Sequence, residues 1–262
     1  MFCSTRASAL FLRCTTALWV LLAVLPSHAA AQTSASDSTF LDSDWSLTQF
    51  LAGNGGSSTA AQVLAGGNPG SFRNVTDVLN AAPPGSQTIV LSTSIYTPFT
   101  YSPSVAGAIA SLNYVEDAAC TAGCFGDGQS TGPALLQGGN LYILIPVVIT
   151  GPSTAWSLHT LNGLTAADFG RVNVTPFTIV DNTQHPNFSA GGTPIQFGFF
   201  RANGTSLNGA GYTLAAGIDN WQVTLLAAAT PPSAIPALGM AELAVLAGLL
   251  ARLAMAFLRR AR

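Results

Sequence analysis

The chain has 262 residues, of which 48% are hydrophobic and only 8% are charged, and its formal net charge is −2. This composition excludes a disordered chain, and it is not that of a basic protein that binds nucleic acid. Between residues 32 and 233, three arginines stand against ten acidic residues, so this segment carries a charge of −7, while the other arginines lie near the two ends.

The first residues are typical of a secretory signal peptide. Arg6 and Arg13 precede an apolar run over residues 17–25, which is too short to span a bilayer. We therefore expect residues 1–31 to direct export and then to be removed.

Small residues mark the expected cleavage site. Ala29 and Ala31 fit the small pockets of signal peptidase, which would cut before Gln32. Signal peptidase is thus a predicted partner, and residues 32–39 are predicted to form a flexible N-terminus before the folded domain.

Short β-rich runs separated by Gly, Asn and Pro recur from residue 40 to residue 228. Apolar and polar residues alternate over 110–114 and 221–225, which gives each of these strands one buried and one wet face. The chain is therefore predicted to be all-β, with one jelly-roll-like β-sandwich over residues 40–228. Further candidate strands cover residues 45–51, 71–79, 88–96, 141–149, 155–161 and 194–201, with a short helical turn at 164–169.

Two motifs invite an enzymatic interpretation. Residues 128–132 match the Gly-x-Ser-x-Gly nucleophile elbow around Ser130, and Asp168 or Asp181 followed by His185 would complete the order of a hydrolase triad. An elbow must lead from a strand into a helix, however, and here the chain continues into another strand. Hydrolysis at Ser130 is therefore disfavoured.

Glycoside hydrolysis needs two carboxyl groups at a set separation. Glu116 and Asp117 are adjacent on a strand and point to opposite faces, and Asp127 lies across a loop, so the three are interpreted as a solvated loop rim. The sequence predicts that the protein is not an enzyme.

Cys120 and Cys124 are the cysteines that remain after export. An oxidising compartment favours a disulfide between them, which would fix the turn that carries the neighbouring acids. Two cysteines without a nearby histidine do not make a tetrahedral zinc site. His159 and His185 are too far apart in sequence to form a local metal motif.

Calcium is the one cofactor that the sequence suggests testing. Asp42 or Asp44, before the first expected strand, would approach Asp219 or Asn220 near the last strand, because sandwich folds often pair these strands. The alternative is that the acids only terminate strands. No other cofactor is expected.

Three tryptophans are candidates for stacking on sugars. Trp45, Trp156 and Trp221 each stand in a strand pattern, however, so that packing in the core is the favoured interpretation.

The last part of the chain is predicted to be an anchor. A Pro-rich linker over 229–234 precedes an apolar segment over 236–258, which is long enough for a transmembrane helix although Glu242 and Arg252 interrupt it. The arginines at its end would keep that end cytoplasmic and the domain outside; they are Arg259, Arg260 and Arg262.

This tail resembles a known type of bacterial sorting signal. Ile235, Pro236, Ala237 and Leu238, followed by the apolar helix and the arginine cluster, are similar to the IPTL-CTERM tails, which are relatives of PEP-CTERM tails. The resemblance covers about the last thirty residues and departs from the family at Ala237 and at 240–242. It implies that an exosortase-like membrane protease recognises residues 235–262.

The domain also looks like the ectodomains that precede such tails. Asp44-Trp45 and the glycine-rich segments at 66–70, 132–140 and 217–223 resemble parts of concanavalin-like or galactose-binding-like sandwiches. The resemblances imply an exported envelope or surface protein, held at the membrane or released after processing, with a structural or adhesive role in a matrix. The alternatives are a carbohydrate-binding module, whose partner is extracellular polysaccharide, and a secreted hydrolase.

Overall fold

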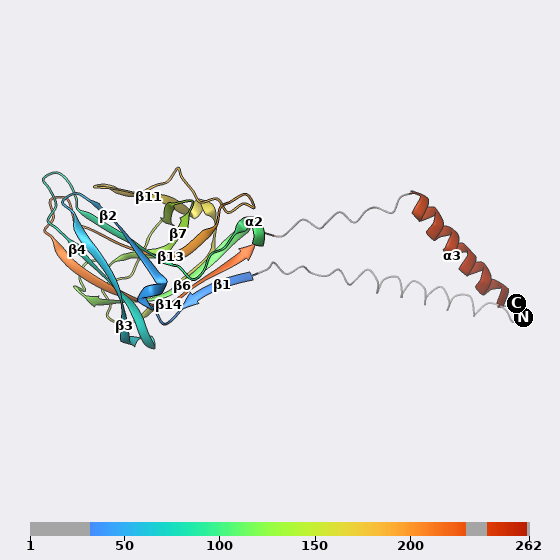
Figure 1. Ribbon diagram of the computed structural model, residues 1–262, viewed down its shortest axis with the longest axis horizontal. Coiled ribbons are helices and arrows are strands. Elements are labelled where there is room, and N and C mark those ends of the chain that lie inside the picture. The colour runs from blue at the N-terminus through green and yellow to red at the C-terminus, as the bar shows by residue number, and fades with distance from the viewer. Residues whose placement is uncertain (1–31, 229–239, 261–262) are drawn as a thin grey trace, which may run out of the picture. The chain divides into compact units, whose positions relative to one another are not determined.

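The structure of the protein, a computed structural model, describes residues 32–228 and 240–260 (Figure 1). Several of the sequence predictions lie outside the described residues: the signal peptide 1–31 with Ala29 and Ala31, the linker 229–234, the motif residues Ile235, Pro236, Ala237 and Leu238, and Arg262.

Two antiparallel sheets form a β-sandwich, which confirms the predicted fold class at this level (Figure 1). Across the first sheet the strands are β10 (Ser157–Leu164), β6 (Ile109–Ala122), β14 (Tyr212–Ala227), β4 (Gly70–Leu79) and β3 (Gly56–Gly67), and β1 (Gln32–Asp37) also pairs with β14. Across the second sheet they are β12 (Thr178–Asp181), β11 (Phe169–Thr175), β8 (Asn140–Leu144), β7 (Ser130–Gln137), β13 (Ile195–Gly204), β5 (Ile89–Tyr96) and β2 (Trp45–Ala52), and β9 (Val148–Ile149) pairs with β7. Short helical turns lie at η1 (Asp42–Asp44), α2 (Pro103–Ala106) and η2 (Ala166–Asp168).

Aromatic side chains join the two sheets in the core. Trp221 on β14 and Trp45 at the start of β2 pack edge to face with ring centroids 5.0 Å apart, and Phe199 on β13 packs against Trp45 at 5.3 Å. Trp45 and Trp221 are both buried. The core interpretation of these two tryptophans is therefore confirmed, because the alternating pattern of each strand directs them between the sheets.

The first strand corrects one prediction. Residues 32–39 were expected to be flexible, but β1 pairs antiparallel with β14 from Gln32 opposite Leu226 to Asp37 opposite Trp221. The pairing of β14 with β4 covers only Tyr212–Ile218, and β1 takes the position beyond it. The N–H and C=O groups on that edge of β14 need hydrogen-bond partners, and residues 32–37 provide them. The segment therefore forms a strand although it has no alternating apolar pattern.

The predicted strands are recovered with shifted ends, and one of them is divided. The run expected at 141–149 forms β8 and β9, with Pro146 between them, as a proline that lacks a ladder donor predicts. Besides β1, three strands were not predicted, namely β3, β11 and β12. Strand β3 is an edge strand that pairs with β4, and its many small and polar residues give no alternating apolar signal.

The C-terminal helix also differs from the prediction. Helix α3 covers Met240–Arg260, and residues 236–239 of the predicted span lie outside the described residues. The helix includes four charged residues: Glu242, Arg252, Arg259 and Arg260. Within residues 32–228 and 240–260, no helix has both the length and the apolar character that crossing a membrane requires. The predicted transmembrane helix is therefore not supported.

Candidate ligand-binding cleft

The loop between β6 and β7 is closed by a disulfide. Cys120 and Cys124 are bonded, as the sequence predicted. Between them Gly123 has a positive φ of 64°, and a Cβ atom there would lie 2.2 Å from the carbonyl oxygen of Thr213. The loop therefore lies tightly against the start of β14, and glycine is the residue that permits both the conformation and the close approach.

Directly after the disulfide, the exposed ring of Phe125 packs against the half-buried ring of Tyr212. The ring centroids lie 5.2 Å apart in an edge-to-face arrangement, and Phe125 keeps 49% of its surface exposed. The Tyr212 hydroxyl donates a hydrogen bond to the Gly204 carbonyl at 2.9 Å. Burial raises the pKa of Tyr212, so its hydroxyl stays protonated as a donor at neutral pH.

This pair forms one wall of a cleft with a volume of about 580 Å³, here called the Phe125 cleft. The β6–β7 loop, the end of β13, the β13–β14 loop and the start of β14 meet around it. Its polar lining includes Asp127, Ser130, Asn203, Thr205 and Ser206. An exposed aromatic surface therefore faces hydroxyl, amide and carboxylate groups within one concave site.

A buried network fixes one of these polar groups. Gln129 donates from Nε2 to Asn203 Oδ1 and to Asp77 Oδ2, both at 2.9 Å, and Asn203 donates from Nδ2 to the Gly128 carbonyl at 3.2 Å. Burial raises the pKa of Asp77 to about 6, although the hydrogen bond from Gln129 and the charge of Arg201 act in the opposite direction. The amide of Asn203 is therefore held in one orientation from behind the cleft.

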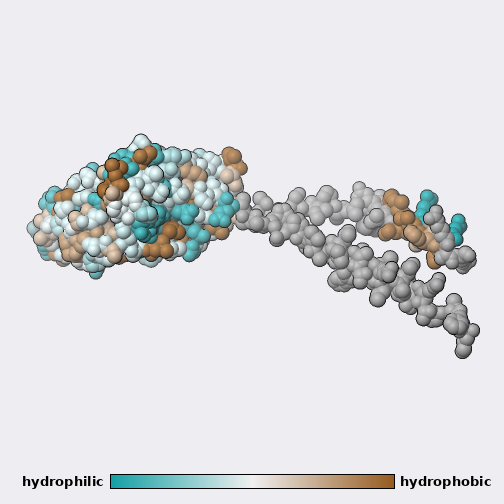
Figure 2. Space-filling view, turned by 90° about the horizontal axis from the view of Figure 1, so that it is seen from below, coloured by the Kyte–Doolittle hydropathy of each residue, from teal (hydrophilic) through white to brown (hydrophobic). Residues whose placement is uncertain are grey.

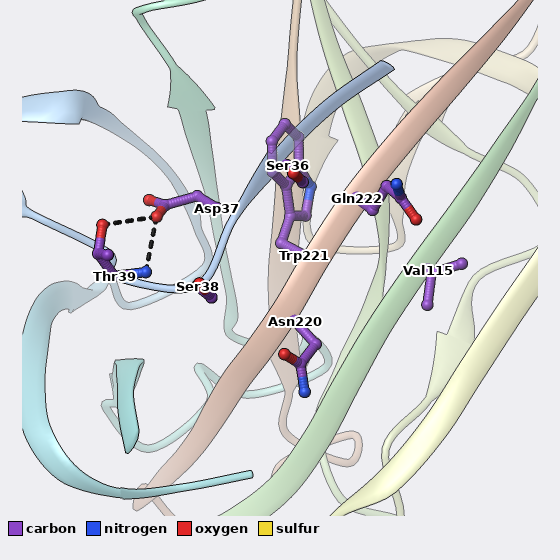
Figure 3. Close-up of a pocket in the computed structure, with 8 residues that line it drawn as sticks. All are labelled: Ser36, Asp37, Ser38, Thr39, Val115, Asn220, Trp221 and Gln222. Carbon is purple, nitrogen blue, oxygen red and sulfur yellow. Dashed lines mark hydrogen bonds between the residues drawn. The ribbon is translucent and has the colours of Figure 1, made fainter. Parts of the chain in front are cut away.

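A second cavity, of about 520 Å³, lies between the end of β1 and strands β14 and β6 (Figure 3). Figure 3 shows the Asp37 carboxylate turned toward Thr39. Its Oδ1 atom accepts hydrogen bonds from the Thr39 backbone at 2.7 Å and hydroxyl at 2.8 Å, and its Oδ2 atom accepts one from Trp45 Nε1 at 2.8 Å. Burial alone would raise the pKa of Asp37, but these bonds outweigh it and lower the pKa.

The Asp37 carboxylate is thus occupied by the protein itself. The aromatic residue that lines this cavity, Trp221, is fully buried and presents no exposed ring face. The cavity therefore lacks the exposed aromatic ring that the Phe125 cleft has, and we regard it as part of the structure that anchors β1.

The residues considered for calcium do not form one cluster. Asp42 makes an ion pair with Arg73 at 2.7 Å, and Asp44 lies in the same helical turn, η1. Asp219 instead lies opposite Asp117 in the pairing of β14 with β6, and Asn220 donates to Asp117 Oδ2 at 2.7 Å. Among the described residues, no three His, Cys, Asp or Glu side chains are placed to hold a metal ion together.

Asp219 receives its hydrogen bonds from backbone groups. The N–H groups of Asn68 and Asn220 both donate to its carboxylate. Burial is the main reason that the pKa of Asp219 is raised, and the nearby charge of Asp117 adds to the effect. The two carboxylates thus hold the β3–β4 turn against the outer face of the first sheet through Asn68, which also donates to Asp117 at 3.1 Å.

Glu116 corrects another prediction. It was interpreted with Asp117 and Asp127 as part of a solvated rim, but its side chain is fully buried between the sheets. Arg201 on β13 forms an ion pair with it at 3.1 Å, and the hydroxyl groups of Tyr114 and Thr131 donate to it at 2.6 and 2.7 Å. The expected opposite directions of Glu116 and Asp117 are confirmed, and it is the inward direction that brings Glu116 to Arg201.

The Gly-x-Ser-x-Gly segment around Ser130 does not lead into a helix, as the sequence analysis predicted. Ser130 begins strand β7, so the Gly-x-Ser-x-Gly segment leads into a strand. His185 Nδ1 lies 2.7 Å from the Phe169 carbonyl oxygen, and Asp168 caps the turn η2 by accepting from Thr165 at 2.7 Å. None of these contacts links His185 to Ser130.

Trp156 is the one of the three tryptophans that lies outside the core. It is half-buried, packs edge to face against Phe72 at 5.3 Å, and donates from Nε1 to the Gly66 carbonyl at 2.9 Å. A Cβ atom at Gly217 would lie 2.7 Å from its ring, so the ring lies close against β14. Contacts with Phe72, Gly66 and Gly217 thus cover part of its indole ring.

The sequence interpretation did not identify Phe125, Tyr212 or Asn203. Phe125 had one detectable signal, because a large aromatic side chain directly follows Cys124 inside a Gly-rich loop. Tyr212 lies on β14 in the first sheet and Asn203 on β13 in the second sheet, and only the packing of the two sheets brings these strand ends together around the cleft.

The surface of the sandwich supports a local site. Large apolar side chains such as Leu64, Val105 and Phe177 are exposed at separate positions, and Figure 2 shows brown areas that are divided by pale and teal surface on the face in view. A broad apolar patch of the kind that marks many protein interfaces is not seen on that face.

The chain was compared with known proteins, and no family model and no curated protein matches it. Among solved structures, it is similar to the family 11 carbohydrate-binding module of a cellulosomal cellulase of Clostridium thermocellum, over 78% of this chain and 100% of the module, with 12% identity and a TM-score of 0.42. A xylan-binding domain from Paenibacillus barcinonensis matches over 77% of this chain and 98% of its own, with 10% identity and a TM-score of 0.37. A protein of unknown function from Shewanella oneidensis matches over 83% and 96%, with 15% identity and a TM-score of 0.37. At these TM-scores none of the likenesses assigns a ligand to this chain.

Proposed function

We propose that the sandwich is a non-catalytic carbohydrate-binding domain whose ligand lies in the Phe125 cleft. The observation that carries this proposal is the exposed ring of Phe125, which packs on Tyr212 beside hydroxyl, amide and carboxylate groups in one cleft of about 580 Å³. A pyranose ring has an apolar C–H face and a rim of hydroxyl groups, and this lining offers a partner for each.

The cleft is also prepared for a ligand before one binds. The disulfide Cys120–Cys124 holds the loop that carries Phe125, and the network behind Asn203 fixes its amide. Groups that are already ordered lose less conformational entropy on binding, so weak individual contacts add up to a useful affinity. This preparation supports a binding role for the cleft.

A catalytic role has less support. The one glutamate of the sandwich, Glu116, is buried and engaged by Arg201, Tyr114 and Thr131, so its carboxylate does not reach a ligand in a cleft. Ser130 lines the cleft without a contact to His185 among the described residues. We therefore place the protein among binding proteins and not among hydrolases.

The setting of this function rests on the sequence. We propose that residues 1–31 direct export, that the tail from Ile235 onward serves as a sorting signal, and that glycan binding gives the exported protein an adhesive role at the cell envelope. A disulfide is typical of proteins outside the cytoplasm, which is consistent with this setting. The finer assignment of the sandwich to a jelly-roll type stays a prediction.

The test is a glycan array probed with the full-length protein, followed by calorimetry on the oligosaccharide that binds best. Phe125→Ala should weaken binding about tenfold or more, because it removes the exposed ring that stacks on the sugar. Phe177→Ala is the matched control: it removes a ring that is 69% exposed in the turn between β11 and β12, away from the cleft.

We expect the control to bind like the unchanged protein. Absence of binding to every glycan on the array would contradict the proposed function. Equal weakening by both substitutions would show that the ring at Phe125 has no special role, and it would contradict the assignment of the cleft.

A further inference from the structure

The charge of the Phe125 cleft limits which glycans it can take. Asp127 is exposed, and among the described residues that line the cleft it alone carries a charged side chain. The other polar lining groups are neutral: the hydroxyls of Ser130, Thr205 and Ser206 and the amide of Asn203. An approaching ligand therefore meets one negative charge and no positive one.

The arginines of the sandwich cannot compensate for this charge. Arg201 is fully buried and paired with Glu116, and the guanidinium of Arg73 is buried and paired with Asp42. Arg171 lies on β11, opposite Asp181 on β12, with β8 and β7 between it and β13. None of the three lines the cleft, and each has an acidic residue as its neighbour.

The surrounding charge has the same sign. Residues 32–233 contain three arginines against ten acidic residues and carry −7 in total. A carboxylate or sulfate on a glycan would be repelled by this field and, inside the cleft, would lose hydration without gaining a cation as a partner. A neutral hydroxyl group would instead donate to the Asp127 carboxylate in a charge-assisted hydrogen bond.

We infer that the Phe125 cleft selects neutral glycan chains and rejects chains that carry carboxylate or sulfate groups, with Asp127 as the residue that determines this selectivity. The inference rests on the proposed carbohydrate-binding function and adds the class of ligand to it. The negative charge acts in two ways, because it attracts hydroxyl donors and repels anions at the same place.

The experiment compares glycans that differ only in charge. The probes are β-1,4-glucan, β-1,4-mannan and β-1,4-galactan oligosaccharides, each next to the same chain oxidised to a carboxylate at C6, together with glucuronoxylan next to the same polymer after its carboxylates are reduced to alcohols. In each pair of probes for which binding is detected, the full-length protein should bind the neutral chain at least about fivefold more tightly than the carboxylated chain. Added salt should reduce this ratio of affinities because it screens the repulsion.

Two substitutions assign the effect to a residue. Asp127→Asn should weaken binding of the neutral chain and should reduce the preference for it over the carboxylated chain. Asp44→Asn changes the net charge equally but at the end of η1, away from the cleft, and should leave the preference unchanged.

Each result decides a different point. If carboxylated chains bind as tightly as neutral ones while Phe125→Ala abolishes both, carbohydrate binding stands and the charge selectivity is wrong. If Asp127→Asn leaves the preference unchanged, Asp127 does not determine it. If no chain of either kind binds, the proposed function itself fails.

Discussion

Three buried carboxylates of the sandwich lie in three different surroundings. Asp37 accepts hydrogen bonds from Thr39 and Trp45, and Glu116 is paired with Arg201. Asp77 accepts from Gln129, while its Oδ1 atom has no hydrogen-bond partner. Removing a carboxylate from water is costly unless a cation or several donors replace the water, so Asp77 is the one of these three whose ionisation opposes folding.

This difference predicts a pH-dependent effect of Asp77→Asn. The pKa of Asp77 is raised from 3.8 to about 6 in the folded protein, so the native state holds the proton more tightly than the unfolded state. Asp77 therefore favours folding most below pH 4, and stability is lost as the pH rises to about 6. The asparagine variant has no such carboxylate and escapes this loss. The difference in unfolding free energy, variant minus unchanged protein, should therefore be more favourable to the variant at pH 8 than at pH 4 by up to about 3 kcal/mol.

Urea unfolding of both proteins at pH 4 and pH 8 measures this change. The other acidic residues titrate in both proteins, so their contribution to the pH dependence cancels in the difference between variant and unchanged protein. What remains is the contribution of Asp77. If this difference instead becomes less favourable to the variant at pH 8 than at pH 4, the fold stabilises the Asp77 carboxylate, and the prediction is wrong.

The same residues show what the sequence can predict at this scale. The alternation around Glu116 predicted correctly that Glu116 and Asp117 face opposite ways. Burial of Glu116 was missed because its partner Arg201 lies 85 residues away on the other sheet, and no local pattern announces such a pair. The cleft residues Asn203 and Tyr212 were missed for the same reason.

At the scale of elements, a disulfide-closed loop positions the aromatic wall of the cleft. Cys120 is buried at the end of β6, and Phe125 follows Cys124 directly. This pairing was predictable, because two cysteines four residues apart in an exported chain have few alternatives. What the loop carries was not predictable, since the contact of Phe125 with Tyr212 depends on the packing of the loop against β14.

Replacing both cysteines by alanine should therefore affect binding more than folding. Closing so short a loop contributes about 2 kcal/mol at most, so the sandwich should stay folded. Glycan affinity should fall by several-fold, because Phe125 must then be ordered during binding. Calorimetry and thermal unfolding on the same samples separate the two effects, and unchanged affinity in a folded variant would contradict a positioning role for the disulfide.

The first strand and the edge strand β3 show how an element can form without its own signal. Gln32–Asp37 has no alternating apolar pattern, yet it is a strand because β14 extends past its pairing with β4. Strand β3 is similar, since its edge position requires few apolar residues. Sequence patterns therefore identified the strands that cross the core and missed those that depend on a neighbour.

At the scale of the whole molecule, the compact unit ends at Ala228. Residues 32–233 should fold alone as a soluble, almost purely β domain, because the strands that build both sheets lie within this range. Circular dichroism of that fragment should show a β spectrum and one cooperative thermal transition. A spectrum dominated by helix, or a gradual transition, would contradict an independent sandwich.

The central claim is that a neutral glycan binds in the Phe125 cleft, and a structure of the full-length protein in complex with the most tightly bound oligosaccharide tests it most directly. The account predicts a pyranose ring packed against Phe125, with its hydroxyl groups bonded to Asp127 and Asn203. A sugar bound instead in the cavity beside Asp37, or on the outer face of the first sheet, would contradict it.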